Sequence, residues 1–143
     1  INQKESLAVL AQRLPLDFAL VAMPYTLLDQ ESLHHGMKKC LQNSTSIIIG
    51  APFASGILAT GSGSNSKYGY TAASEELQEK VKKIESVCQT YEVSLKAAAL
   101  QFVLAHPAVV STIPGAISAN QVTENKHAPV REPLHLLLHP RYC

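Results

Sequence analysis

Small and polar residues that could hold an anion follow two of the apolar segments in this sequence. Gly50, Ala51 and the segment 54–56 (Ala-Ser-Gly) come directly after one apolar run, and small side chains let backbone amides approach an oxyanion closely. Gly115 follows a second apolar run and precedes Ser118, which could cap a helix whose positive end faces the same ligand. The spacing therefore indicates a phosphate-binding site, although the same glycines could serve only as turns between strand and loop.

Other groups that could do chemistry have simpler explanations. His34 and His35 are adjacent on a predicted helix, so their side chains point to different sides and do not easily share a metal. His135 and His139 have the spacing of helical metal ligands, but no third ligand is evident and a proline follows. The Gly-rich stretch 61–69 does not follow a strand and lacks the ending of a P-loop. No metal site is therefore expected.

Three short apolar runs predict the strands that position these loops, at residues 17–23, 46–50 and 108–113. Helical patterns separate them, which predicts an α/β fold with parallel strands buried on both faces. Residues 59–74 are rich in Gly, Ser, Asn and Tyr and predict one long loop. The expected helices span residues 2–13, 30–42, 74–91, 94–105 and 118–125.

Composition narrows the class of protein further. The 143 residues are 46% hydrophobic and 16% charged, with a net charge of +1, so neither nucleic acid nor an anionic membrane surface is an expected partner. The most apolar stretch, 47–58, is too short to span a bilayer, and no secretory signal is evident. Cys40 and Cys88 occupy apolar helical positions and Cys143 is left over, so we expect reduced thiols in a cytoplasmic protein rather than disulfides.

Three stretches of the sequence resemble the aldo-keto reductase superfamily. They are GAPFASGILATG at 50–61, LKAAALQFVLAHPAV at 95–109 and IPGAISANQVTEN at 113–125, and they occur in the order that the family has. The motif Ile-Pro-Gly-Ala followed by Gln-Val-x-x-Asn is fairly specific. The resemblance is closest to the branch of aldose (L-fucose or D-threo-aldose) and pyridoxal dehydrogenases.

This resemblance implies the C-terminal part of a (β/α)₈ TIM barrel, of which about three parallel strands are present. It also implies an extended nicotinamide cofactor, NAD or NADP, over the carboxyl ends of the strands. The residues that match the family's pyrophosphate-contacting loop are Phe53, Ala54, Ser55, Gly56 and Leu58. Those that match its adenosine-contacting segment are Gly115, Ala116, Ser118, Gln121, Glu124 and Asn125.

Departures from the family pattern affect both the cofactor and the chemistry. Many NADP-preferring members carry a Lys and an Arg where this sequence has Gly115 and Gln121, so the resemblance favours NAD. The family's catalytic Asp, Tyr, Lys and His come from the first half of the barrel, and Tyr25, Tyr68 and Tyr70 do not match the catalytic position. No catalytic residue is therefore assigned.

The expected organisation is a partial aldo-keto reductase domain at 1–125 followed by a divergent tail at 126–143. Three functions stay open for such a chain. It could be the cofactor-binding portion of an oxidoreductase acting on an aldose or a similar carbonyl or alcohol. It could also be a non-catalytic dinucleotide-binding or regulatory fragment, or an inactive truncated gene product.

Overall fold

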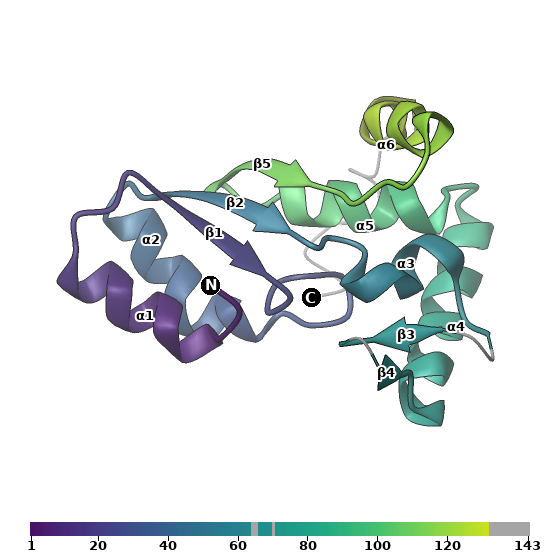
Figure 1. Ribbon diagram of the computed structural model, residues 1–143, viewed down its shortest axis with the longest axis horizontal. Helices are drawn as coiled ribbons and strands as arrows, with labels where there is room; N and C mark the ends of the chain where they lie inside the picture. The colour runs from purple at the N-terminus through teal and green to yellow at the C-terminus, as the bar shows by residue number, and fades with distance from the viewer. Residues whose placement is uncertain (64–65, 70, 132–143) are drawn as a thin grey trace.

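A parallel three-stranded sheet forms the centre of the fold. The computed structural model describes residues 1–63, 66–69 and 71–131. The strands β1 (Phe18–Ala22), β2 (Ser46–Gly50) and β5 (Val109–Ile113) pair in the order β1-β2-β5. Helices connect them, and the three strands do not close on themselves (Figure 1). The prediction of an α/β fold that forms part of a barrel is confirmed.

Helices cover one face of this sheet and extend beyond its end. Figure 1 shows α1 and α2 side by side along β1 and β2, whereas α3, α4 and α6 lie beyond the arrowheads of the strands. α2 continues from a π-helical turn at Leu33–Met37. The helices are α1 (Lys4–Arg13), α2 (Lys38–Gln42), α3 (Ile57–Thr60), α4 (Glu75–Thr90), α5 (Leu95–Leu104) and α6 (Ala119–Arg131).

The covered face of the sheet holds the main core. Val21, Ile47 and Ile49 are fully buried and pack with Leu7 of α1 and with Cys40 of α2. Alternate residues of each strand point to this side because successive side chains of a strand face opposite ways. Cys40 and Cys88 are both buried free thiols, as the sequence indicated.

The other face of the sheet is apolar and exposed, so the expectation of burial on both faces was wrong. Phe18 is 62% exposed, Leu20 45% and Ile113 56%. Among the described residues no layer covers these side chains, which lie on the side of the sheet opposite α1 and α2. In a closed (β/α)₈ barrel this side would face the barrel interior, where side chains from all eight strands fill the space.

Ile1 lies against the free edge of β1 and pairs with it as a parallel strand would. Its terminal ammonium donates to the carbonyl of Leu20 at 2.7 Å, and the Ala22 N–H donates to the Ile1 carbonyl at 2.9 Å. This pattern places Ile1 opposite Val21 in a parallel ladder. The outer edge of β1 therefore has the geometry to accept a further parallel strand.

Two expected element boundaries were wrong. The segment 59–74 is not one loop, because it contains the end of α3 and a small antiparallel hairpin of β3 (Lys67–Tyr68) and β4 (Thr71–Ala72). The last helix runs to Arg131 and does not stop at Asn125. Its backbone continues past that point because Ala128 packs against the cluster around Leu100, which stabilises the added turns.

Candidate functional site

The loops that the sequence singled out leave the sheet at one edge. Gly50, the last residue of β2, is paired with Ala22 at the end of β1 and with Ile113 at the end of β5. All three arrowheads in Figure 1 point toward α3 and the hairpin. The carboxyl ends of parallel strands are where ligands collect in α/β folds, so this edge is the candidate site.

The loop after β2 has an unusual backbone. Ala51, Ala54 and Ser55 have φ values of 52°, 48° and 62°, and Gly56 has 104°. For residues other than glycine such a conformation costs about 1–3 kcal/mol each and is usually kept where it serves a site. Successive amides in this kind of turn converge and form a concave surface that attracts anions. In this loop the N–H groups of Ala54 and Gly56 donate to the carbonyls of Ala51 and Phe53 at 2.9 Å, so they are already bonded.

Most side chains of this loop are not available to a ligand. Phe53 is 7% exposed, and Ala54 and Leu58 are fully buried in a cluster with Ile57 and Leu100. The half-buried Ser55 and Gly56 remain at the surface. Phe53, Ala54 and Leu58 therefore anchor the loop, and the N–H groups of Ala54 and Leu58 already donate to the carbonyls of Ala51 and Phe53.

The Ser55 hydroxyl ties three segments together. Its Oγ accepts the Gly69 N–H of the hairpin at 2.9 Å, and its proton is directed to the Met23 Sδ after β1 at 3.8 Å. The hairpin, the strained loop and the end of β1 are thereby held at one point. Sequence analysis assigned Ser55 to the loop, but it had no signal for this link to the hairpin.

Glu85 of α4 holds the segment that leads into the hairpin. One carboxylate oxygen accepts the Ser62 N–H at 3.2 Å, and the other accepts the Ser62 hydroxyl at 2.7 Å. Gly61 has a φ of 84°, and a Cβ there would overlap the same carboxylate. The approach therefore requires glycine at position 61 for both backbone and steric reasons.

Replacement of Glu85 by Ala is expected to loosen this segment without unfolding the sheet. Hydrogen bonds to a charged acceptor contribute about 1.5–3 kcal/mol, so amide exchange of Ser62 should accelerate roughly tenfold or more. Hydrogen exchange read by mass spectrometry or NMR measures this effect. Glu76→Ala removes an exposed carboxylate from the first turn of the same helix and should leave Ser62 protected. Unchanged exchange at Ser62 in Glu85→Ala would contradict the anchoring role.

The loop after β5 is held by the start of α6, where one half of the predicted capping box forms and the Gln121 side chain bonds the residue before the cap. Ser118 Oγ accepts the Gln121 N–H at 3.3 Å, and Gln121 Oε1 accepts the Ile117 N–H at 2.9 Å. The buried Asn125 donates from Nδ2 to the Gly115 carbonyl at 3.2 Å. The side chains of Gln121 and Asn125 therefore hold the loop in place. The Gln121 Oε1 and one N–H of the Asn125 amide are bonded within the protein and are not available to a ligand.

A pocket of about 270 Å³ lies between this loop, α5 and α6. Of the residues expected to contact adenosine, Ala116 and Asn125 line it, and the carboxylate of Glu124 pairs instead with Lys96 at 2.6 Å. Five further lining residues could not be predicted from the sequence, because they meet only when α5 packs against α6. These residues are Leu100, Thr112, Pro114, Val122 and Lys126.

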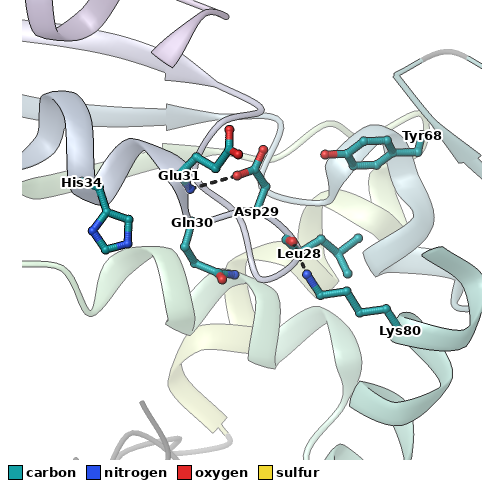
Figure 2. Close-up of a pocket in the computed structure, with 7 residues that line it drawn as sticks. All are labelled: Leu28, Asp29, Gln30, Glu31, His34, Tyr68 and Lys80. Atoms are coloured by element: carbon teal, nitrogen blue, oxygen red, sulfur yellow. Dashed lines mark hydrogen bonds between the residues drawn. The ribbon is translucent and has the colours of Figure 1, made fainter. Parts of the chain in front are cut away.

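A second pocket, of about 480 Å³, lies between the segment after β1 and the hairpin. Figure 2 shows the Tyr68 hydroxyl directed toward Asp29, and Glu31 lies beside Asp29. The Lys80 ammonium donates to the Leu28 carbonyl at 2.6 Å. Burial raises the pKa of Tyr68, and the carboxylates of Asp29 and Glu31 raise it further. Tyr68 is therefore a weaker acid than a free tyrosine and stays protonated at neutral pH.

The described part of the chain contains no cluster of three or more metal-ligating side chains. His34 and His35 are both exposed, and of the two His34 lines the second pocket. His135 and His139 lie outside the described residues. The helices within the described ranges also include none with the length and apolar character that a bilayer crossing requires.

The parallel sheet with helices on one face has the architecture of part of a (β/α)₈ barrel. The sequence profile of the aldo/keto reductase family matches residues 3–134. The chain belongs to the aldo/keto reductase family.

Two characterised relatives are similar to most of the chain. Pyridoxal 4-dehydrogenase of Microbacterium luteolum is 33% identical over 125 residues, which cover 87% of this chain and 36% of the relative. D-threo-aldose 1-dehydrogenase of a Pseudomonas species is 34% identical over 111 residues, which cover 77% of this chain and 34% of the relative. The chain thus spans about a third of the length of these relatives.

Solved structures support the same fold. The aldo-keto reductase AKR11C1 of Bacillus halodurans matches in its apo form with a TM-score of 0.66 and 22% identity, over 88% of this chain and 42% of that one. Its holo form matches with a TM-score of 0.67 and 21% identity, over 94% of this chain and 44% of that one. The similarity covers less than half of that enzyme, in agreement with an incomplete barrel.

Proposed function

We propose that this chain is the cofactor-binding portion of an NAD(P)-dependent oxidoreductase whose complete form acts on an aldose or a similar carbonyl or alcohol. The observation that carries the proposal is the left-handed backbone at Ala51, Ala54, Ser55 and Gly56, which follow β2 on the same sheet edge as the pocket after β5. Family membership and the two dehydrogenase relatives support the same class of chemistry.

The residues present fit a dinucleotide in two respects. The small residues of the 51–56 loop suit a pyrophosphate, because they let backbone groups approach it closely, although the Ala54 and Gly56 N–H groups already donate to Ala51 and Phe53. The pocket after β5 combines apolar walls with a few polar groups, at Thr112, Asn125 and Lys126, which suits a nucleoside. A bound nicotinamide ring accepts or donates a hydride, and this chain's residues bind and orient the cofactor. The proposed contacts are Phe53, Ala54, Ser55, Gly56, Leu58, Gly115, Ala116, Ser118, Gln121, Glu124 and Asn125.

NAD is the favoured cofactor in this proposal. Gly115 and Gln121 offer no charge to a 2′-phosphate, and the Gln121 Oε1 is already bonded to the Ile117 N–H. A doubly charged phosphate is bound best by charged donors. The reduced and buried Cys40 and Cys88 fit a reducing compartment, so we place the protein in the cytoplasm.

We assign no catalytic residue to this chain, and we extend the proposal to a partial domain at 1–125 with a divergent tail at 126–143. General acid catalysis by a tyrosine at neutral pH requires a lowered pKa, whereas the pKa of Tyr68 is raised. In this proposal the chain contributes cofactor binding, and the groups that transfer the proton are supplied by the remainder of a complete barrel.

Titration with NADH tests the proposal directly. We expect saturable binding at micromolar to millimolar cofactor, read from the fluorescence of NADH itself because the chain contains no tryptophan. Asn125→Ala should weaken binding severalfold, because it removes the bond that holds the Gly115 carbonyl. Thr90→Ala at the far end of α4 serves as a matched control. No binding at millimolar NADH by the folded chain would refute the proposal.

A further inference from the structure

A histidine just beyond the end of α5 closes the turn that leads into β5. The Ala108 N–H donates to His106 Nδ1 at 3.2 Å, and the Val109 N–H donates to the His106 carbonyl at 2.9 Å. The Ala108 carbonyl in turn accepts the Ile47 N–H of β2 at 2.7 Å. His106 therefore fixes the backbone at the point where β5 joins β2.

The imidazole of His106 is half-buried against an aromatic pair. Its ring centroid lies 5.8 Å from that of Tyr25 at an interplanar angle of 72°, and the Tyr25 ring lies 5.4 Å from that of Phe102. Tyr25 is 4% exposed and follows β1, so the imidazole connects the entry of β5 with the segment that leaves β1. Among the described residues, the titratable group in ring contact with the imidazole is the Tyr25 phenol, which is uncharged in acid.

The bond from Ala108 requires a neutral imidazole. A nitrogen that accepts a hydrogen bond is unprotonated, whereas the imidazolium carries an N–H donor on both of its nitrogens. Protonation of His106 would therefore place a second donor against the Ala108 N–H and leave a charge in a half-buried position. Burial lowers the pKa of His106, which favours the same neutral form.

We propose that His106 is an acid-sensitive latch, whose neutral imidazole holds the entry of β5 against β2 and whose protonation releases the Ala108 N–H. This latch does not depend on the proposed cofactor site, which follows the opposite ends of the strands. Because the native state favours the neutral form, the unfolded chain binds this proton first as the pH falls below 6.5. The latch therefore stabilises the fold fully above that pH, and its contribution is lost as the pH falls through the pKa of the folded state.

Hydrogen exchange of the Ala108 amide, corrected for the intrinsic exchange rate at each pH, tests this latch in the full chain. From about pH 8 to about pH 5 we expect protection of Ala108 to fall about fivefold, as the loss of one hydrogen bond allows. His106→Asn should keep the protection at both pH values, because an Asn side chain can bond the backbone two residues on and does not titrate. His106→Leu should lack it at both. His35→Gln removes an exposed histidine from another helix and should leave the pH dependence unchanged.

Three results would overturn the latch. One is protection of Ala108 that does not change with pH in the unmodified chain. Another is an equal loss in acid for the unmodified chain and His106→Asn, because the titrating group would then lie elsewhere. The third is an NMR titration in which the pKa of His106 lies at or above 6.5. Circular dichroism identifies global unfolding: acid unfolding of the unmodified chain while His106→Asn stays folded supports the latch, and unfolding of both at the same pH overturns it.

Discussion

Leu7→Ala is expected to lower the free energy of unfolding by about 2–5 kcal/mol, because it leaves a cavity in a core that cannot collapse freely. Leu7 is fully buried and packs α1 against the helical segment that leads into α2. Val9→Ala provides the control on the same helix, since Val9 is 45% exposed and should cost much less. Urea denaturation followed by circular dichroism measures the difference.

Gly36 is the partner that this packing requires. A Cβ at position 36 would lie 2.5 Å from Leu7 Cγ and 2.8 Å from Leu7 Cβ, so Gly36→Ala should cost about 1–3 kcal/mol through overpacking. The double variant Leu7→Ala/Gly36→Ala should lose less than the sum of the single losses, because the added methyl enters the space that Leu7 leaves. Strict additivity of the two changes would show that the residues do not contact each other as described.

Ser55→Val is expected to reduce NADH affinity at least tenfold. Ser55 has a φ of 62°, which is a true outlier for a β-branched residue and would add about 1–3 kcal/mol of strain. The substitution also removes the acceptor of the Gly69 N–H, so the hairpin loses its bond to the loop. Both effects disfavour the loop conformation that we propose for pyrophosphate binding.

Two comparisons separate strain from the lost hydrogen bond. Ser55→Gly tolerates the backbone conformation but lacks the hydroxyl, so it should bind NADH better than Ser55→Val and worse than the unmodified chain. Ser86→Val on α4 tests the effect of the same change away from the site, because the Ser86 hydroxyl bonds only within its helix, to the Lys82 carbonyl. Wild-type affinity in Ser55→Val would refute the role of this loop. Amide exchange at Gly69 reports the loss of the hairpin contact independently.

Several elements could be predicted from the sequence because their causes are local. The apolar runs at 17–23 and 46–50 predict strands through β-branched and apolar side chains, and β1 and β2 form inside them. Ser74 and Ser94 cap α4 and α5 by accepting the N–H of the residue three positions later. Ser118 accepts the Gln121 N–H as the predicted capping box requires, whereas the Gln121 side chain accepts the Ile117 N–H in place of the Ser118 N–H.

Other features could not be predicted because distant segments create them. A continuous apolar run does not reveal that Val21 is buried while Leu20 is 45% exposed, since that difference depends on which face the helices cover. Two-residue strands such as β3 have no recognisable pattern, and the hairpin is held from outside by the Ser55 hydroxyl. The last helix extends beyond its expected end because Ala128 packs against the cluster around Leu100.

The sequence alone determined the three strands of the main sheet, most of the helices, the family and the two loops at the carboxyl edge of the sheet, because these depend on periodicity, caps and short motifs. Only the tertiary structure decided how those loops are held and what surrounds them. The Ser55 hydroxyl, on a left-handed backbone, bonds Gly69, which lies 14 positions away. Glu85 bonds Ser62, which lies 23 positions away. Lys126 enters the pocket for the same reason, because Leu100 and Val122 form its walls only when α5 and α6 pack together.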